Sequence, residues 1–384
     1  MSVKIMLSAG EVSGDLHGKR LAEALLRQQP DLELFGFGGA QMEAAGVRLL
    51  RNFADYNVMG IGEVLANLRR ILKLLAYLAE QMREERPDLL VLIDYPDFNW
   101  RLAKKAKALG IPVFSYIPPS AWAWRKGRAK DCAKLADEFI AIFPHELAPY
   151  EAAGARISFV GNPLVETVRP DLTAAEAREF FGLAKSEPAI LLLPGSRKQE
   201  IDLLLPRMLG AVKLLAEKRP ETRFFLPVAD RKLEPKIRKM LAEAGVRVRL
   251  TYEHRYALFG IASAAMATSG TVVMEAALMG LPCVVLYRLS RLSYLVGKLM
   301  VHVDNFSLPN ILLNESFQTE LLQGEVQPER IASEVLRLYP GEAHRAEVLQ
   351  KLAAACEKLG PPGAADRAAE KIIAAARRAG AGNK

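Results

Sequence analysis

The chain has 384 residues, about twice the usual length of a single domain, so we expect two domains. Its composition, 51% hydrophobic and 25% charged, is ordinary for a globular protein and excludes intrinsic disorder and collagen-like repeats. The formal net charge of +8 favours anionic partners, whether nucleic acid, phosphorylated metabolites or acidic lipid. Three widely spaced cysteines predict neither a disulfide framework nor a zinc pair.

The sequence gives no sign of export or of a membrane span. No run reaches the roughly 18 apolar residues that a spanning helix needs. The apolar run Met1–Leu7 lacks the basic start and the cleavage site of a signal peptide. We therefore expect the chain to stay in the cytoplasm.

The first half alternates apolar runs of strand length with longer helical patterns, among them Asp15–Arg27 and Glu63–Arg83. Strands that are hydrophobic throughout and separated by helices predict a parallel sheet covered on both faces. The expected strands are Val3–Ala9, Leu32–Phe37, Leu89–Asp94, Val113–Ile117 and Phe139–Phe143.

The pattern pauses near residue 165 and restarts at Thr173 and Glu176, which have the spacing of a capping box. A second α/β set then follows, so we predict an N-terminal domain at 1–165 and a C-terminal domain at 166–345. An Ala-rich helical tail, 346–384, is expected to pack on an N-terminal domain, and exchange of this tail between chains would give a homodimer. The second set of strands is Ile190–Leu193, Phe224–Val228, Val246–Leu250, Ala264–Ser269 and Cys283–Tyr287.

Four loops at the ends of expected strands are candidates for chemistry, because ligands of open α/β sheets bind at the carboxyl ends of strands. The glycines of the first loop would let the backbone approach a ligand closely. Its carboxylates suit a sugar hydroxyl or an attacking alcohol better than a pyrophosphate. The alternative is a tight turn in which Asp15 caps a helix. The residues of this first loop are Gly10, Glu11, Ser13, Gly14 and Asp15.

The second loop follows the most central of the apolar runs and contains Asp94, Pro96 and Asp97. Pro96 ends the strand because it cannot donate to a ladder, which leaves Asp94 at the rim. A rim carboxylate beside apolar walls can act as a general base for an alcohol. A helix cap is the alternative, and it fits Asp97 better than Asp94.

The third loop has the composition of a diphosphate site. The amides of Gly195 and Ser196 would lie at a helix N-terminus, and Arg197 would add a planar set of donors. Charge that develops on a departing diphosphate would be stabilised there. The alternative is a surface turn with a solvated arginine.

The fourth loop predicts a second anion site that faces the third. Ser269 and Thr271 supply hydroxyls, and Gly270 begins the first turn of a helix. Glu275 lies one turn past Thr271 in an otherwise apolar helix, so we expect it to accept hydrogen bonds from a ribose diol. The five histidines show no ligand spacing, and no metal site or cofactor is expected.

The helix expected at 63–83 is amphipathic and basic. Such helices lie in the headgroup layer of anionic membranes. A helix that covers the sheet is the alternative, and the two interpretations are compatible. Residues 288–302 are a weaker candidate for contact with a membrane. The aromatic loop 118–125 could stack on a ligand or, equally, pack against a domain edge. The membrane-facing candidates are Arg69, Arg70, Leu72, Lys73 and Leu75.

Together these loops resemble those of the lipid-A-disaccharide synthase family, from Ser8 to about Gln327. Met59–Ile61, Ser120–Arg125 and Ser307–Asn310 extend the resemblance. The sequence departs from it at position 162, where it has asparagine and many members have histidine. The resemblance implies an inverting, metal-independent glycosyltransferase of the GT-B architecture, with two Rossmann-like domains and an active site in the cleft between them.

The resemblance also implies a reaction and its partners. Diacylglucosamine would pass from its UDP derivative to the 6-hydroxyl of diacylglucosamine 1-phosphate, giving a β-1,6-linked disaccharide and UDP. The enzyme would act without nucleic acid, on the cytoplasmic face of the inner membrane of Gram-negative bacteria. Asp94 would be the general base, Glu11 would face the acceptor, and Asn310 would line the nucleotide side of the cleft. The third and fourth loops would hold the diphosphate, with Glu275 on the ribose.

Two alternatives remain open at this stage. Another GT-B enzyme acting on a UDP-sugar, such as a UDP-N-acetylglucosamine epimerase, would turn over a water-soluble substrate without lipid. A non-catalytic protein that binds nucleic acid or membrane is suggested by the net charge. No RNP aromatics and no helix-turn-helix spacing support nucleic-acid binding.

Overall fold

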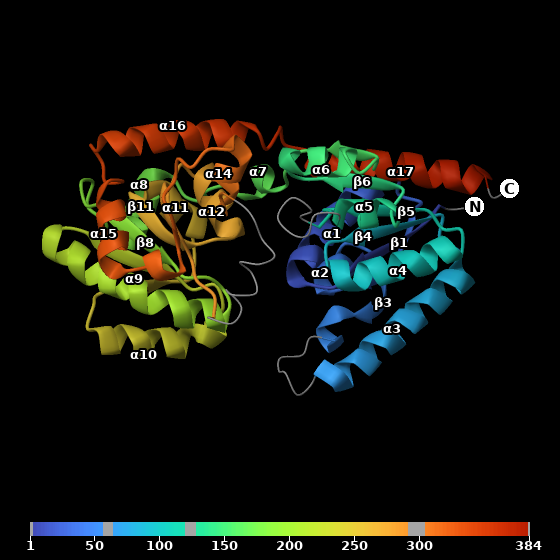
Figure 1. The fold of residues 1–384 in the computed structure, drawn as a ribbon, viewed down its shortest axis with the longest axis horizontal. Coiled ribbons are helices and arrows are strands. Elements are labelled where there is room, and N and C mark those ends of the chain that lie inside the picture. The colour runs from blue at the N-terminus through green and yellow to red at the C-terminus, as the bar shows by residue number, and fades with distance from the viewer. Residues whose placement is uncertain (1–2, 57–63, 120–127, 291–303, 383–384) are drawn as a thin grey trace. The chain divides into compact units, whose positions relative to one another are not determined.

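The computed structural model describes residues 3–56, 64–119, 128–290 and 304–382, which form two compact units (Figure 1). Unit 1 comprises Met1–Pro163 and Pro361–Lys384, and unit 2 comprises Leu164–Gly360. The resemblance at 59–61, most of the aromatic loop 118–125 (residues 120–125) and most of the second basic segment (residues 291–302) lie outside the described residues.

Unit 1 contains a seven-stranded parallel sheet of order β3-β2-β1-β4-β5-β6-β7. β1 and β4 are neighbours, and Ala9 at the end of β1 pairs with Ile93 at the end of β4. The carboxyl ends of these two strands are therefore level, so the loops that follow them start side by side. The strands are β1 (Lys4–Ala9), β2 (Glu33–Gly38), β3 (Arg48–Asn52), β4 (Leu89–Ile93), β5 (Val113–Tyr116), β6 (Glu138–Ala141) and β7 (Ile157–Phe159).

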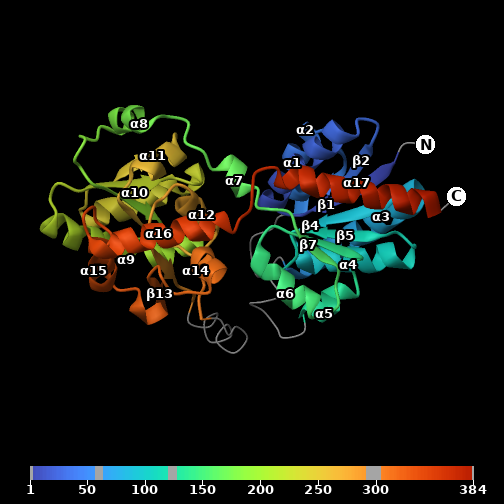
Figure 2. The ribbon, with the colours of Figure 1, turned by 90° about the horizontal axis from the view of Figure 1, so that it is seen from above.

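Helices cover both faces of this sheet, and alternate residues of each strand serve the two faces. Ile5 of β1 joins a core with α1 and α17, whereas Met6 joins a core with α3 and α4. Figure 2 shows α17 running along α1. The helices are α1 (Val12–Gln28), α2 (Ala40–Ala44), α3 (Val64–Glu85), α4 (Pro96–Ala108), α5 (Arg128–Ala133), α6 (Leu147–Glu151) and α17 (Ala364–Gly382).

Unit 2 contains a six-stranded parallel sheet of order β10-β9-β8-β11-β12-β13. The prediction of two α/β domains with parallel sheets is thus confirmed. The predicted capping box is confirmed as well, since Thr173 N donates to Glu176 Oε2 at 2.8 Å and Glu176 N donates to Thr173 Oγ1 at 3.3 Å. The strands are β8 (Ala189–Leu193), β9 (Arg223–Pro227), β10 (Arg249–Thr251), β11 (Ala264–Thr268), β12 (Cys283–Tyr287) and β13 (Glu320–Leu322).

The helices of unit 2 flank its sheet, and α9 and α15 pack against each other. A buried core of strand residues lies beneath α8, α11 and α12. The helices are α7 (Leu164–Thr167), α8 (Ala174–Phe181), α9 (Lys198–Lys218), α10 (Glu234–Ala244), α11 (Arg255–Ile261), α12 (Thr271–Leu278), α14 (Leu308–Leu313), α15 (Pro328–Leu336) and α16 (Ala343–Glu357).

The C-terminal segment returns to unit 1 later than position 346, where we expected the tail to start. α16 packs on α12 and α14 within unit 2. The chain re-enters unit 1 at Pro361, because Gly360–Gly363 interrupts the helical pattern and separates α16 from α17. α17 is then held by Arg377, whose Nη2 donates to Gln29 Oε1 at 2.8 Å, and by Arg367, whose Nε donates to Val160 O at 2.8 Å.

α3 covers the sheet and also presents a basic exposed surface. Its Leu75 is 7% exposed and belongs to the core of unit 1, so the prediction that Leu75 faces a membrane is wrong. Leu72 is 46% exposed, and Arg69, Arg70 and Lys73 are exposed around it. Among the described residues, no helix has the length and apolarity to cross a bilayer.

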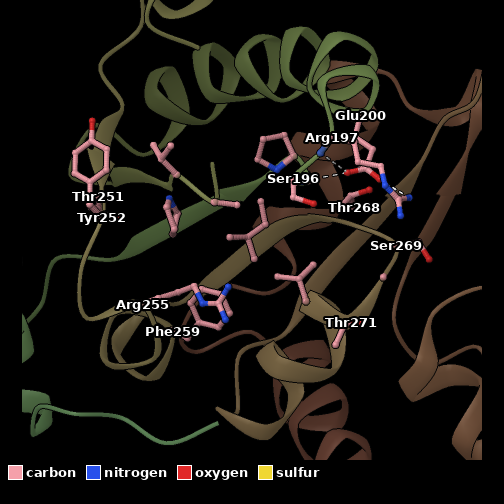
Figure 3. A pocket seen from close by; sticks show the side chains of 18 of the residues that line it. Ser196, Arg197, Glu200, Thr251, Tyr252, Arg255, Phe259, Thr268, Ser269 and Thr271 are labelled. Atoms are coloured by element: carbon pink, nitrogen blue, oxygen red, sulfur yellow. Dashed lines mark hydrogen bonds and ion pairs between the residues drawn. The ribbon is translucent and has the colours of Figure 1, made fainter. Parts of the chain in front are cut away.

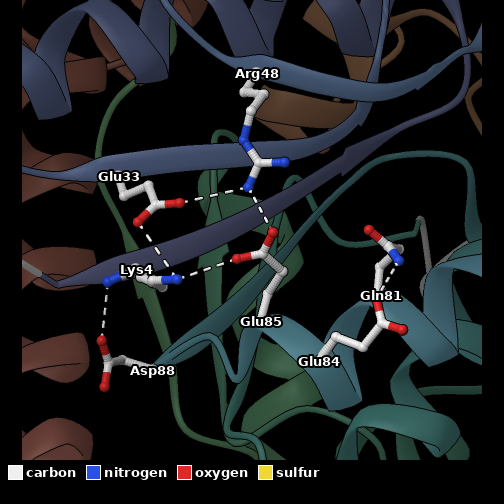
Figure 4. A network of polar contacts seen from close by, with 7 residues as sticks. All are labelled: Lys4, Glu33, Arg48, Gln81, Glu84, Glu85 and Asp88. Carbon is white, nitrogen blue, oxygen red and sulfur yellow. Dashed lines mark hydrogen bonds and ion pairs between the residues drawn. The ribbon is translucent and has the colours of Figure 1, made fainter.

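A network of charges fastens the end of α3 to the amino edge of the sheet (Figure 4). Glu85 accepts from Lys4 Nζ at 3.0 Å and from Arg48 Nη2 at 2.9 Å. Glu33 lies 3.5 Å from Lys4 Nζ, and Asp88 accepts from the Lys4 N–H at 2.9 Å. The hydrogen bond from Lys4 is the main cause that lowers the pKa of Glu85 below its usual value. These contacts tie α3 to β1 and β3.

Candidate functional site

A buried asparagine joins the ends of β1 and β4. Asn99 Nδ2 donates to Ser8 O at 3.1 Å and to Asp94 O at 2.7 Å, and its Oδ1 accepts from Ser8 Oγ at 2.7 Å. Asp94 and Tyr95 have φ angles of 49° and 50°, a left-handed conformation that non-glycine residues rarely adopt. The hydrogen bond from Asn99 holds the Asp94 carbonyl in this conformation. The conformation at the start of the loop after β4 is therefore fixed by the contact of Asn99 with the end of β1.

The first and second predicted loops lie against each other at this edge of the sheet. A Cβ on Gly10 would lie 2.1 Å from Cδ1 of Tyr95, so only glycine fits there. A Cβ on Gly14 would lie 3.4 Å from the carbonyl oxygen of Ile93. Close packing on Tyr95 of the second loop thus accounts for Gly10, whereas a Cβ on Gly14 would make only an ordinary van der Waals contact with the end of β4.

Asp15 has a structural role in this arrangement. Its Oδ1 accepts from the N–H groups of Gly39 at 2.8 Å and Met42 at 3.1 Å, and its Oδ2 accepts from Gln41 N at 3.1 Å. A carboxylate at a helix N-terminus satisfies amides that have no partner inside the helix. The cap that sequence analysis left open therefore exists, but on α2 rather than on the helix that contains Asp15. Glu11 and Ser13 remain exposed on the first loop.

Asp94 has the electrostatics of a general base. Burial raises the pKa of its carboxyl, and a hydrogen bond from the Tyr95 N–H opposes this to a smaller extent. Burial also raises the pKa of Tyr95, and the charge of Glu11 adds to this shift. A carboxylate with a raised affinity for protons is better matched to removing a proton from an alcohol.

Unit 2 has a hollow of about 540 Å³ at the carboxyl ends of its strands (Figure 3). Its lining draws on the ends of β8, β9, β10 and β11, which is where ligands bind in open α/β sheets. The structure brings the third and fourth predicted loops together in this hollow. The predicted residues that line it are Gly195, Ser196, Arg197, Ser269, Gly270 and Thr271.

One of the two predicted anion sites already has an internal acceptor. Glu200 Oε2 accepts from Ser196 N at 3.0 Å and from Arg197 N at 3.1 Å, so these amides at the start of α9 are capped. A Cβ on Gly195 would lie 2.1 Å from Glu200 Oε2, which explains the glycine with its φ of 110°. The Arg197 guanidinium remains 79% exposed in the same hollow. The Ser196 amide is therefore paired with Glu200 in this structure, and its binding to a phosphate stays a prediction.

The other predicted anion site is open. α12 begins after Gly270, and glycine has no side chain that could cap the helix. No described residue accepts a hydrogen bond from the amides of Gly270, Thr271 and Val272. These three residues all line the hollow. Unpartnered amides at the start of a helix, near a guanidinium, make a site for a phosphate group.

Glu275 and Asn310 lie outside the lining of this hollow. Glu275 Oε1 accepts from Arg255 Nη2 at 3.2 Å and from Tyr256 OH at 3.3 Å, so it supports Arg255, which does line the hollow. Asn310 is fully buried, and its Nδ2 donates to Gln318 O at 2.9 Å and to a Glu320 carboxylate oxygen at 2.7 Å. Asn310 therefore joins α14 to β13.

Sequence reasoning missed the part of the hollow at and after the end of β10, which supplies Thr251, Tyr252 and Arg255. Thr251 is 6% exposed, and its hydroxyl has no partner among the described residues. The expected strand ended at Leu250, whereas β10 ends at Thr251. With the correct boundary, Thr251 would have been recognised as a polar residue at a strand end.

Comparisons with known proteins identify what the chain is similar to. A model of the lipid-A-disaccharide synthetase family matches residues 5–371. A lipid-A-disaccharide synthase of Myxococcus xanthus is 45% identical, over 96% of this chain and 97% of the relative. One of Syntrophus aciditrophicus is 42% identical, over 95% of this chain and 96% of the relative.

Solved structures with the same fold are much more distant in sequence. A UDP-GlcNAc 2-epimerase from Neisseria meningitidis bound to UDP-GlcNAc has a TM-score of 0.64 and 14% identity, covering 97% of this chain and 100% of that chain. The glycotransferase of kitacinnamycin has a TM-score of 0.68 and 15% identity, covering 97% and 99%. At these identities the likeness shows the fold alone, two parallel-sheet α/β domains of the GT-B type.

The open amides of α12 can be tested by removing one of them. Thr271 is the first residue of α12, a position that tolerates proline, so Thr271→Pro deletes one N–H without breaking the helix. We expect Thr271→Pro to weaken UDP binding about tenfold relative to Thr271→Ala, the scale of one hydrogen bond to a charged group. Thr271→Ala is the matched control because it removes the hydroxyl and keeps the amide. Equal dissociation constants for the two variants in titration calorimetry would place the diphosphate elsewhere.

Proposed function

The chain belongs to the lipid-A-disaccharide synthetase family of glycosyltransferases, and we propose that it transfers diacylglucosamine from UDP-diacylglucosamine to the 6-hydroxyl of diacylglucosamine 1-phosphate. The observation that carries this proposal is the placement of Asp94, a half-buried carboxylate at the end of a central strand. Its raised pKa and its left-handed backbone suit a group that takes a proton from an alcohol.

The donor's UDP group is proposed to bind in the hollow of unit 2. The amides of Gly270, Thr271 and Val272 would bind the diphosphate, and Arg197 would neutralise the charge that grows on it as it leaves. Arg255, held by Glu275, would add a second cation on the nucleotide side. The buried hydroxyl of Thr251 gains a partner when a nucleotide fills the hollow.

The acceptor sugar is proposed to approach the first and second loops of unit 1. Asp94 would take the proton from the 6-hydroxyl, and the oxygen would attack C1 of the donor sugar while the bond from C1 to the UDP oxygen breaks. One displacement inverts the configuration at C1 and needs no covalent intermediate with the protein. Glu11, exposed beside Tyr95, would face the acceptor.

The role of Asp94 can be tested by an isosteric substitution. We expect Asp94→Asn to lower kcat about 100-fold or more, because asparagine cannot accept the proton. Asp97→Asn removes the same charge three residues away, at an exposed site on the first turn of α4, and should change kcat less than threefold. Disaccharide formation from both radiolabelled substrates measures this. A fall of less than fivefold in Asp94→Asn would exclude Asp94 as the base.

The pH dependence of the reaction follows from the same group. The base must be deprotonated, so kcat/KM should fall as the pH drops through the pKa of Asp94, which burial holds above its ordinary value. The acid limb should therefore lie at higher pH than for an exposed aspartate, and Asp94→Asn should lack it.

The exposed part of α3 is proposed to dock the enzyme on the cytoplasmic face of an anionic membrane. Both substrates carry acyl chains, so the enzyme must work where those chains remain in lipid. Arg69, Arg70 and Lys73 would bind anionic headgroups, and Leu72 would enter the boundary of the acyl layer. The network around Glu85 fastens the other end of α3 to the sheet, so docking would orient the whole of unit 1.

Reversal of charge on α3 tests this docking. Arg69, Arg70 and Lys73 changed together to Glu should lower the fraction that sediments with anionic liposomes at least tenfold, since each cation near such a surface contributes about 1 kcal/mol. The matched control changes Arg101, Lys104 and Lys105, three exposed cations of α4, to Glu. An equal loss of liposome binding in both triple variants would show that only net charge matters. Unchanged binding of the α3 variant would exclude α3 as the docking surface.

A further inference from the structure

A second carboxyl group lies buried near Asp94 and has no part in the mechanism above. Glu146 ends the turn that follows β6, and β5 is the one strand between β6 and β4. Its side chain is 5% exposed. The carboxyl accepts from the N–H groups of Phe143 and Ile142, yet its Oε2 has no partner among the described residues. Buried carboxyl oxygens without partners are rare because they lose their hydration without replacement.

The turn that carries Glu146 is held from several sides. Asn162, itself fully buried, donates from Nδ2 to the carbonyl of Ile142 at 3.1 Å. Tyr150 of α6 is also buried and donates from its phenol to Pro119 O at 2.9 Å. Buried contacts therefore hold the chain on both sides of Glu146.

Burial is the main influence on Glu146, and Asp94 adds a smaller electrostatic one. Burial raises the pKa of Glu146 to about 8, and the negative charge of Asp94 adds to that shift. Burial also lowers the pKa of His145, beside it in the turn, to about 4, and that of His17 on α1 to about 4. Between pH 4 and 8 both histidines and Glu146 are thus neutral. Among Asp94, Glu146, His145 and His17, the deprotonated Asp94 is then the charged group.

We propose that Glu146 is a positioning residue that must stay protonated for Asp94 to act as the base. As a neutral acid it lets the ends of β4, β5 and β6 pack around one negative charge, the charge on Asp94. Once Glu146 loses its proton, a second buried carboxylate would repel Asp94, and the edge would relieve the repulsion by opening. The geometry that holds Asp94 toward the acceptor would then be lost. This proposal rests on the proposed function of Asp94.

The sign of the effect on stability follows from where Glu146 holds its proton. The folded chain keeps this proton up to about pH 8, whereas the unfolded chain releases it near the ordinary value of 4.5. Between these values the folded state binds more protons than the unfolded state, so stability falls as the pH rises. Glu146→Gln has no titratable group at this position, so its stability should not fall with pH for this reason.

The experiment compares the wild type, Glu146→Gln and Glu151→Gln in the full chain between pH 6 and 9. Glu151 is exposed on the adjacent α6, so its substitution removes a charge without touching the buried site. We expect kcat of the wild type and of Glu151→Gln to fall about tenfold by pH 9, one unit above the pKa of Glu146. Glu146→Gln should keep its kcat at pH 7 and lose less than twofold at pH 9.

Urea unfolding gives a readout that does not depend on activity. The midpoint of Glu146→Gln should rise relative to the wild type between pH 5 and 8.5. The proposal would be overturned if the wild type and Glu146→Gln had identical pH profiles of kcat. It would also be overturned if their urea midpoints differed by a constant amount across this range. A wild type that forms no disaccharide at pH 7 would instead refute the proposed function, while the midpoints would still report whether Glu146 titrates as a buried acid.

Discussion

The hydrogen bonds from Asn99 to the ends of β1 and β4 are the contacts on which the candidate site depends. Asp94 and Tyr95 both have left-handed backbone angles, each costing on the order of 1–3 kcal/mol. Such a conformation persists because Asn99 Nδ2 binds the Asp94 carbonyl and its Oδ1 binds the Ser8 hydroxyl. Gly10 completes the arrangement by leaving room for the Tyr95 ring. The carboxylate is thus placed by backbone strain that a buried amide compensates.

The two helix N-termini at the hollow of unit 2 show how similar motifs can differ in what they offer a ligand. α9 is capped by its own Glu200, so its first amides are satisfied within the protein. α12 begins at Thr271, after Gly270, which has no side chain to cap the helix, and the residues that carry its first amides line the hollow without an acceptor among the described residues. In the proposed function, a diphosphate would therefore meet one open helix end and the exposed Arg197. The start of α9 is thus satisfied within the protein, whereas the start of α12 is open to a ligand.

Much of this arrangement could be predicted from the sequence, and the failures share a physical cause. Buried strands such as β4 and the loops after them can be predicted, because apolar runs and glycines are recognised from neighbouring residues in the sequence alone. The strands β3, β7 and β13 were missed, since edge strands are short and partly polar. Asp15 caps a helix that starts 25 residues later, and Leu75 is buried by the sheet beneath it. The positions of Asp15 and Leu75 depend on contacts between segments that are far apart in the sequence, and residue spacing does not reveal such contacts.

The placement of Asp94 by Asn99 is the central claim, and the kinetics of Asn99→Ala test it most directly. The account predicts a fall in kcat of about 100-fold with the secondary structure retained, because a displacement of about 1 Å in a reacting group costs that much. A variant that keeps the circular dichroism of the wild type and more than a third of its kcat would show that Asp94 needs no such support, and would contradict the account.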